Sequence, residues 1–228
     1  MTDAPARSEP DQTDAEATLP AFFDRIAGEH PSALALSSPT GSATYGELSL
    51  ASNRIANAIL KAGGKPSDRV ALLMSHDSPL IAAALAILRA GRIAVVLNPT
   101  DPPERLKHFL DDADSGLILA DPSHREAAHH LAGDRRHVLA LDASTANESE
   151  RDPASSVRPD DLAFLVYTSA STGRPKAVMQ THRNILRNAF RLSRGMEMRT
   201  TDRVALLASL SGGQGLATTW CALSSGAS

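Results

Sequence analysis

The sequence is poor in cysteine, in aromatic residues and in long apolar runs. Cys221 is the single cysteine of the 228 residues, so no disulfide can form within the chain, and a reducing compartment is expected. The longest apolar run, Leu80–Leu88, is about half the roughly 18 residues that a membrane-spanning helix needs. We therefore expect no membrane span.

An excess of charge of one sign is also missing. Lysine and arginine number 23 against 26 aspartate and glutamate, which gives a net charge of −3. This balance offers no basic surface for nucleic acid or for a charged membrane, so neither is expected as a partner. The first residues lack the charged and then apolar pattern of a secretion signal, and we predict a cytoplasmic protein.

What the chain does contain is enough apolar sequence for a folded core. Apolar residues make up 42% of it and charged residues 21%, both typical of globular domains. Residues 1–18 are rich in acids and poor in apolar side chains, which predicts a disordered tail.

Residues 19–141 show short apolar runs alternating with helical patterns, and we expect them to form a first α/β subdomain. Thr44 and Glu47 have the spacing of a capping box at a helix start, and Asp101 is expected to cap a later helix. The expected strands are 70–74, 93–97, 117–119 and 138–141. Continuous apolar strands separated by helices predict an α/β fold, with a mostly parallel, doubly wound sheet that has helices on both faces.

Residues 142–160 contain almost no large apolar side chain and are predicted to form a linker loop. A further apolar strand, 162–166, follows this loop. We expect 161–228 to hold a phosphate loop and the truncated start of a second α/β subdomain.

The segment directly after that strand carries the strongest chemical signal. Between two predicted strands it combines four hydroxyl side chains with a glycine and a lysine: Thr168, Ser169, Ser171, Thr172, Gly173 and Lys176. Short hydroxyls and exposed backbone N–H groups can surround a polyphosphate, and the ammonium adds a point charge. The spacing is not that of a Walker loop, since Ala177 stands at the position of the Mg²⁺-binding hydroxyl. The residues alone leave open a solvated, serine- and threonine-rich turn.

Residues 165–178, read together, resemble the phosphate loop of the adenylate-forming (AMP-binding) superfamily, which includes acyl-CoA synthetases and the adenylation domains of nonribosomal peptide synthetases. Three further blocks resemble this superfamily in the same order: 44–48, 87–99 and 180–184. The resemblance covers about residues 19–228, which is less than half of such an enzyme.

The resemblance implies ATP-dependent activation of a carboxylic acid, with formation of an acyl-adenylate and release of pyrophosphate. It implies that the six loop residues named above hold the ATP phosphates and that Thr168 also reaches Mg²⁺. A thiol of CoA or of a carrier protein would then take the acyl group. His182 follows Thr181 at the start of the next helix, and either a structural role or a place at the site is open for it.

The same resemblance implies that the catalytic residues lie downstream of Ser228. They are an acid for Mg²⁺, an aspartate for the ribose, an aromatic residue for adenine and a lysine in a mobile C-terminal domain. The alternative is a truncated, inactive relic that acts at most as a nucleotide-binding or interaction module.

Three positions depart from the superfamily pattern. Ala170 and Ala177 stand where it has glycine, so the loop is strained if either position needs a positive φ. Gly213 falls where members that activate amino acids carry an aspartate for the substrate ammonium. Its lack of charge favours an aryl, acyl or unusual acid over an ordinary α-amino acid.

Overall fold

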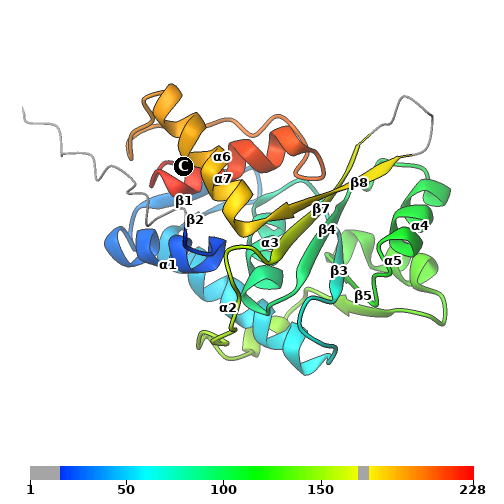
Figure 1. The fold of residues 1–228 in the computed structure, drawn as a ribbon. Helices are drawn as coiled ribbons and strands as arrows, with labels where there is room; N and C mark the ends of the chain where they lie inside the picture. Colours follow the sequence, from blue (N-terminus) through cyan, green and yellow to red (C-terminus); the bar gives the residue numbers. More distant parts are fainter. Residues whose placement is uncertain (1–15, 169–174) are drawn as a thin grey trace, which may run out of the picture.

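A computed structural model of the protein describes residues 16–168 and 175–228, and its centre is a six-stranded sheet (Figure 1). The strand order is β6-β5-β3-β4-β7-β8, and all neighbours are parallel except β7 and β8, which form an antiparallel pair. The strands are β3 (Arg69–Leu73), β4 (Ile93–Leu97), β5 (Leu117–Ala120), β6 (His137–Ala140), β7 (Leu162–Thr168) and β8 (Lys176–Thr181). A separate hairpin joins β1 (Leu34–Ser38) to β2 (Gly41–Thr44).

Helices cover both faces of the sheet. They are α1 (Leu19–Glu29), α2 (Tyr45–Lys61), α3 (Ser78–Arg89), α4 (Pro103–Asp112), α5 (Arg125–Ala132), α6 (His182–Gly195) and α7 (Gly213–Ser224). Figure 1 shows the sheet between α4 and α5 on one side and α2 and α3 on the other.

Side chains along β3 alternate between two apolar cores. Val70 and Leu72 join the core formed with α1, α2, α3, α6 and α7, whereas Ala71 and Leu73 join the core formed with α4 and α5. Because both faces are covered there, the central strands β3, β4 and β5 consist almost entirely of apolar side chains, which explains the continuous apolar runs. The predicted α/β fold with a mostly parallel, doubly wound sheet is confirmed.

Local capping confirms one helix start and corrects another. Thr44 Oγ1 accepts a hydrogen bond from Glu47 N at 3.2 Å, and Glu47 Oε2 accepts one from Thr44 N at 2.8 Å. The expected cap by Asp101 is wrong, because Pro102 occupies the N-cap position of α4 and makes no side-chain cap bond. The Asp101 carboxylate lies 3.8 Å from Arg105 instead.

The predicted linker 142–160 lies along α2, where Asn57 Nδ2 donates to the carbonyls of Ser149 and Arg151, each at 2.9 Å. After this segment the chain returns to the same sheet, since β7 pairs with β4. The division into two subdomains stays a prediction.

Of the predicted tail, residues 1–15 lie outside the described residues, and Thr18 forms the N-cap of α1.

No helix in the described ranges has the length and apolar character to cross a membrane.

A buried arginine joins the first three helices. Arg89, at the end of α3, is 2% exposed, and its Nη1 donates to Asp24 Oδ2 of α1 at 2.9 Å. Its Nε donates to Ser52 Oγ of α2 at 2.9 Å, and its Nη2 to Ser49 Oγ at 3.0 Å. A buried cation is tolerated only when such partners are present, so this cluster fixes α1 and α2 against α3.

We expect Asp24→Ala to lower the free energy of unfolding by about 2 kcal/mol, because Arg89 would stay buried without its counter-charge. Urea unfolding monitored by circular dichroism measures this change. Asp134→Ala, at an exposed aspartate, is the matched control. Equal stability of the two variants would contradict the role given to Arg89.

Candidate functional site

The carboxyl end of β7 brings two of the predicted site residues together. Thr168, the last residue of β7, pairs in register with Lys176, the first residue of β8, and both are exposed. Thr168 Oγ1 lies 3.5 Å from the Lys176 carbonyl oxygen. The other four predicted phosphate-binding residues, Ser169, Ser171, Thr172 and Gly173, lie outside the described residues.

Tyr167 anchors this end of β7 to α4. Its ring stacks on Phe109 with a centroid separation of 4.2 Å, and its hydroxyl donates to Asp112 Oδ2 at 2.8 Å. Burial and the hydrogen bond to Asp112 raise the pKa of Tyr167 above its usual range. The phenol therefore stays protonated as a donor and ties the end of β7, next to Thr168, to α4.

The alanine at position 177 is accommodated without strain. Ala177 pairs with Tyr167 in the regular antiparallel ladder and is not among the described residues with positive φ. Glycine's conformational freedom is not needed there, so this departure from the superfamily pattern leaves the strand intact. Ala170 lies outside the described residues.

A surface cavity with a volume of about 310 Å³ lies beside Thr168. We call this cavity the β7–α7 hollow. Its lining comes from β7, β8, α6 and α7: Val166, Thr168, Val178, Gln180, Asn184, Ile185, Asn188, Gly213, Leu216 and Ala217. Among the described residues, those that line the hollow carry no charge. The hollow therefore combines apolar walls with the neutral polar groups of a threonine, a glutamine and two asparagines.

The two asparagines come from one face of α6. Asn184 and Asn188 are four residues apart and lie one helical turn from each other. The Asn188 Oδ1 accepts a hydrogen bond from Arg191 Nη2 at 3.0 Å. Sequence reasoning missed Asn188 altogether and gave Asn184 no role. The one available signal was their spacing, which places both amides on the same face of the helix. The buried residues of that helix include Ile185, Leu186, Ala189 and Phe190.

The start of α7 forms the opposite wall. Gly213, the first residue of α7, is among the residues that line the hollow. Gly215 lies where the backbone of the preceding segment passes close by, since a Cβ there would lie 2.1 Å from the Ser209 carbonyl oxygen. Any larger residue at 215 would displace α7, so this glycine sets the position of the wall.

His182 has the structural role rather than a place in the hollow. Its ring is buried, and its Nδ1 accepts a hydrogen bond from Leu19 N at 3.2 Å. Burial lowers the pKa of His182 from its ordinary 6.5 to about 4, partly offset by the charge of Asp161. The neutral ring thus joins α6 to α1, and it is not among the residues that line the hollow.

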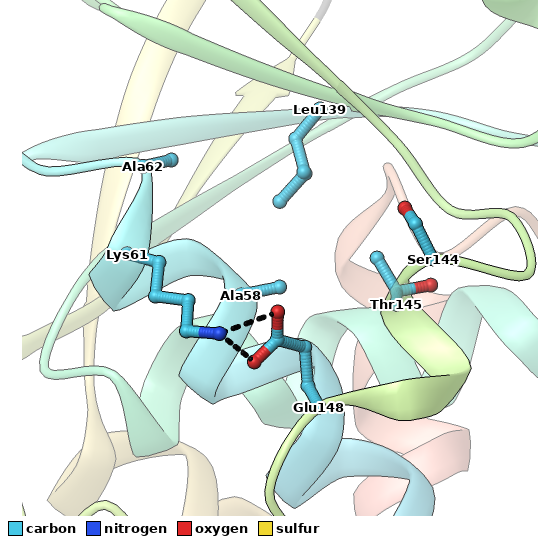
Figure 2. A pocket seen from close by; sticks show the side chains of 7 residues that line it. All are labelled: Ala58, Lys61, Ala62, Leu139, Ser144, Thr145 and Glu148. Carbon is cyan, nitrogen blue, oxygen red and sulfur yellow. Dashed lines mark hydrogen bonds and ion pairs between the residues drawn. The ribbon is translucent and has the colours of Figure 1, made fainter.

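A second hollow, of about 230 Å³, lies between the end of α2, β6 and the segment 144–148. Figure 2 shows Lys61 and Glu148 pointing toward each other across it, with Lys61 Nζ 2.7 Å from Glu148 Oε2. The two charges neutralise each other, and Thr168 and Lys176 do not line this hollow. It is therefore not a candidate for the phosphate chemistry.

The described part of the site fits a polyphosphate with Mg²⁺. Lys176 offers an exposed cation and Thr168 an exposed hydroxyl, both of which suit phosphate oxygens. Within the described ranges no three acidic, histidine or cysteine residues gather into a metal site. A single hydroxyl ligand is consistent with a Mg²⁺ that takes its other ligands from phosphate and water.

Comparison with known protein families gives a match over most of the chain. Residues 23–228 match the family described as AMP-binding enzyme. Among curated relatives, the antimetabolite synthetase AmbB of Pseudomonas aeruginosa is 37% identical over 185 residues, which are 77% of this chain and 14% of AmbB. The phosphinothricin tripeptide synthetase PhsC of Streptomyces viridochromogenes is 35% identical over 173 residues, which are 74% of this chain and 16% of PhsC. The chain therefore spans only a small part of these relatives.

A solved structure agrees with this match. The nonribosomal peptide synthetase FmoA3 bound to AMPPNP superposes with a TM-score of 0.84 at 26% identity, over 97% of this chain and 23% of FmoA3. The form of FmoA3 bound to α-methyl-L-serine-AMP gives a TM-score of 0.86. The six-stranded sheet is thus one part of a larger architecture in that protein.

We expect the stability of the protein to fall as the pH is lowered from 6.5 to 4, in part through His182. The unfolded chain binds a proton to this residue near pH 6.5, whereas the folded chain does so only near pH 4. The neutral His182 therefore contributes fully to the free energy of unfolding above pH 6.5. This contribution falls by about 2–3 kcal/mol as the pH is lowered to 4.

Urea unfolding at pH 6.5 and at pH 4 measures this effect. Between these pH values the free energy of unfolding of His182→Gln should fall by about 2–3 kcal/mol less than that of the unsubstituted protein. His137→Gln, at an exposed histidine of β6, is the control. Parallel curves for His182→Gln and the unsubstituted protein would contradict the burial of a neutral ring.

Proposed function

Because the chain belongs to the AMP-binding enzyme family, we propose that it is the N-terminal portion of an ATP-dependent ligase that activates a carboxylic acid. The product would be an acyl-adenylate, with release of pyrophosphate. The observation that carries this proposal is the register of β7 and β8, which pairs Thr168 with Lys176 at the carboxyl end of the sheet. Open α/β sheets bind their ligands at that end of the strands.

Lys176 is proposed to hold the phosphates of ATP. Attack of a carboxylate oxygen on the α-phosphorus forms one P–O bond and breaks the bond to the pyrophosphate oxygen, so negative charge increases on the leaving group. An ammonium fixed on a strand stabilises that charge more in the transition state than in the ground state. Thr168 would offer its hydroxyl to phosphate or to Mg²⁺, together with the loop residues Ser169, Ser171, Thr172 and Gly173.

The β7–α7 hollow is proposed to hold the acyl group of the acid. Its volume of about 310 Å³ suits a small organic molecule. Thr168 belongs both to the hollow and to the proposed phosphate end, so an acid in the hollow would have its carboxylate next to the α-phosphate. Holding both reactants in this way replaces an encounter in solution by a fixed geometry.

The acceptor of the activated acyl group is proposed to be a thiol, either of CoA or of a carrier protein. No described residue selects between them. A reaction that consumes ATP, in a protein with one cysteine, fits the cytoplasm, which stays our prediction for its location.

The test is carboxylate-dependent exchange of pyrophosphate into ATP, measured on the protein purified from its native source. We expect Lys176→Ala to lower the exchange rate by about 10²–10³-fold, because a charge aimed at the leaving group is lost. Lys61→Ala is the matched control, since Lys61 is paired with Glu148 at the second hollow.

Each result has a separate meaning. Exchange that survives Lys176→Ala at the full rate would contradict the phosphate assignment. ATP binding that depends on Lys176, without exchange for any acid, would instead support the nucleotide-binding module over the ligase.

A further inference from the structure

The amide of Asn188 has a fixed orientation. Arg191 can only donate hydrogen bonds, so the atom of Asn188 that lies 3.0 Å from Arg191 Nη2 must be the acceptor oxygen. The Nδ2 amino group is therefore the part of the side chain left to face other partners. Within the described residues this group makes no hydrogen bond to the protein, and Asn188 lines the β7–α7 hollow. The hollow thus has a positioned hydrogen-bond donor on its α6 wall.

The electrostatics of the hollow disfavour a cation. No carboxylate stands among the described lining residues, and the Arg191 guanidinium is hydrogen-bonded to Asn188. An ammonium placed there would lose its water without gaining a counter-charge and would be repelled by Arg191. An uncharged group with a lone pair meets neither penalty.

The remaining surface near Asn188 is apolar. Ile185, on the same helix, and Leu216, on the facing wall, are both buried residues of the lining. A hydrocarbon skeleton would pack against them, but a purely apolar group that covers Asn188 would take water from its donor without replacing the hydrogen bond. The wall therefore favours a group that is apolar apart from one acceptor atom.

We propose that Asn188 selects acids whose acyl group is uncharged and carries a hydrogen-bond acceptor, such as a keto, amide or hydroxyl oxygen, at the α6 wall. Arg191 is the positioning residue that holds the amide. This inference rests on the proposed function, in which the hollow holds the acyl group, and it adds the substrate class. A site built to bond a polar atom rejects the analogue that lacks it more strongly than an apolar site rejects an added group.

The experiment measures binding to the protein through the backbone and side-chain amide resonances of a ¹⁵N-labelled sample. The probes are matched acids that differ at one position, namely 4-oxopentanoate, 4-methylpentanoate and 4-aminopentanoate, each titrated with ATP present. We expect 4-oxopentanoate to bind about tenfold more tightly than either analogue. It should also shift the Asn188 side-chain amide resonances.

Two variants separate selection from folding. Asn188→Leu should abolish the preference for the oxo acid over the methyl acid. Arg191→Gln, at an exposed position, should weaken the preference while leaving the fold intact. Arg187→Gln is the matched control, because this exposed arginine of α6 lies near Glu16 instead and does not line the hollow.

The inference is overturned if the methyl or amino acid binds as tightly as the oxo acid, if no acid shifts Asn188 or Gly213, or if Asn188→Leu keeps the preference. Titration with ATP alone reports on the proposed function separately through the resonances of Thr168 and Lys176. Shifts there without acid selectivity would reject only the substrate class, whereas their absence would reject the phosphate site itself.

Discussion

The candidate site depends on the pairing of β7 with both of its neighbours. β7 lies parallel to β4 and antiparallel to β8, so its hydrogen bonds fix it on both edges. A slip of one residue would exchange the side chains that β7 gives to the two cores, so Phe164 and Leu165 would each have to repack on the opposite face. The register therefore determines that Thr168 and Lys176 emerge opposite each other.

Contacts from distant parts of the chain then close the site around this strand end. Tyr167 is held by Phe109 and Asp112 of α4, while α6 is joined to α1 through His182 and Leu19. These contacts join segments far apart in the sequence, so the position of the end of β7 depends on α4 and that of the α6 wall depends on α1. A site of this kind is positioned by the packing of strands and helices around it.

The fold and part of the site could be predicted from the sequence because their causes are local. Continuous apolar runs required a sheet covered on both faces, and Thr44 with Glu47 required a capped helix. Asp101 shows the limit, since a proline next to it took the cap position. The spacing of Asn184 and Asn188 indicates a shared face of α6, but it could not place Asn188 in the lining of a hollow, because that depends on how α6 packs against α7. The neutral role of His182 likewise depended on a contact with Leu19, far away in sequence.

The most direct measurement of the central claim is acetylation of lysine side chains with and without ATP, followed by mass spectrometry. The chain carries Lys176 and three internal references, Lys61, Lys65 and Lys107. A phosphate site at the end of β7 predicts that ATP slows acetylation of Lys176 severalfold and leaves the three references unchanged. Equal protection of all four lysines, or protection of a reference instead of Lys176, would contradict a phosphate site at this strand end.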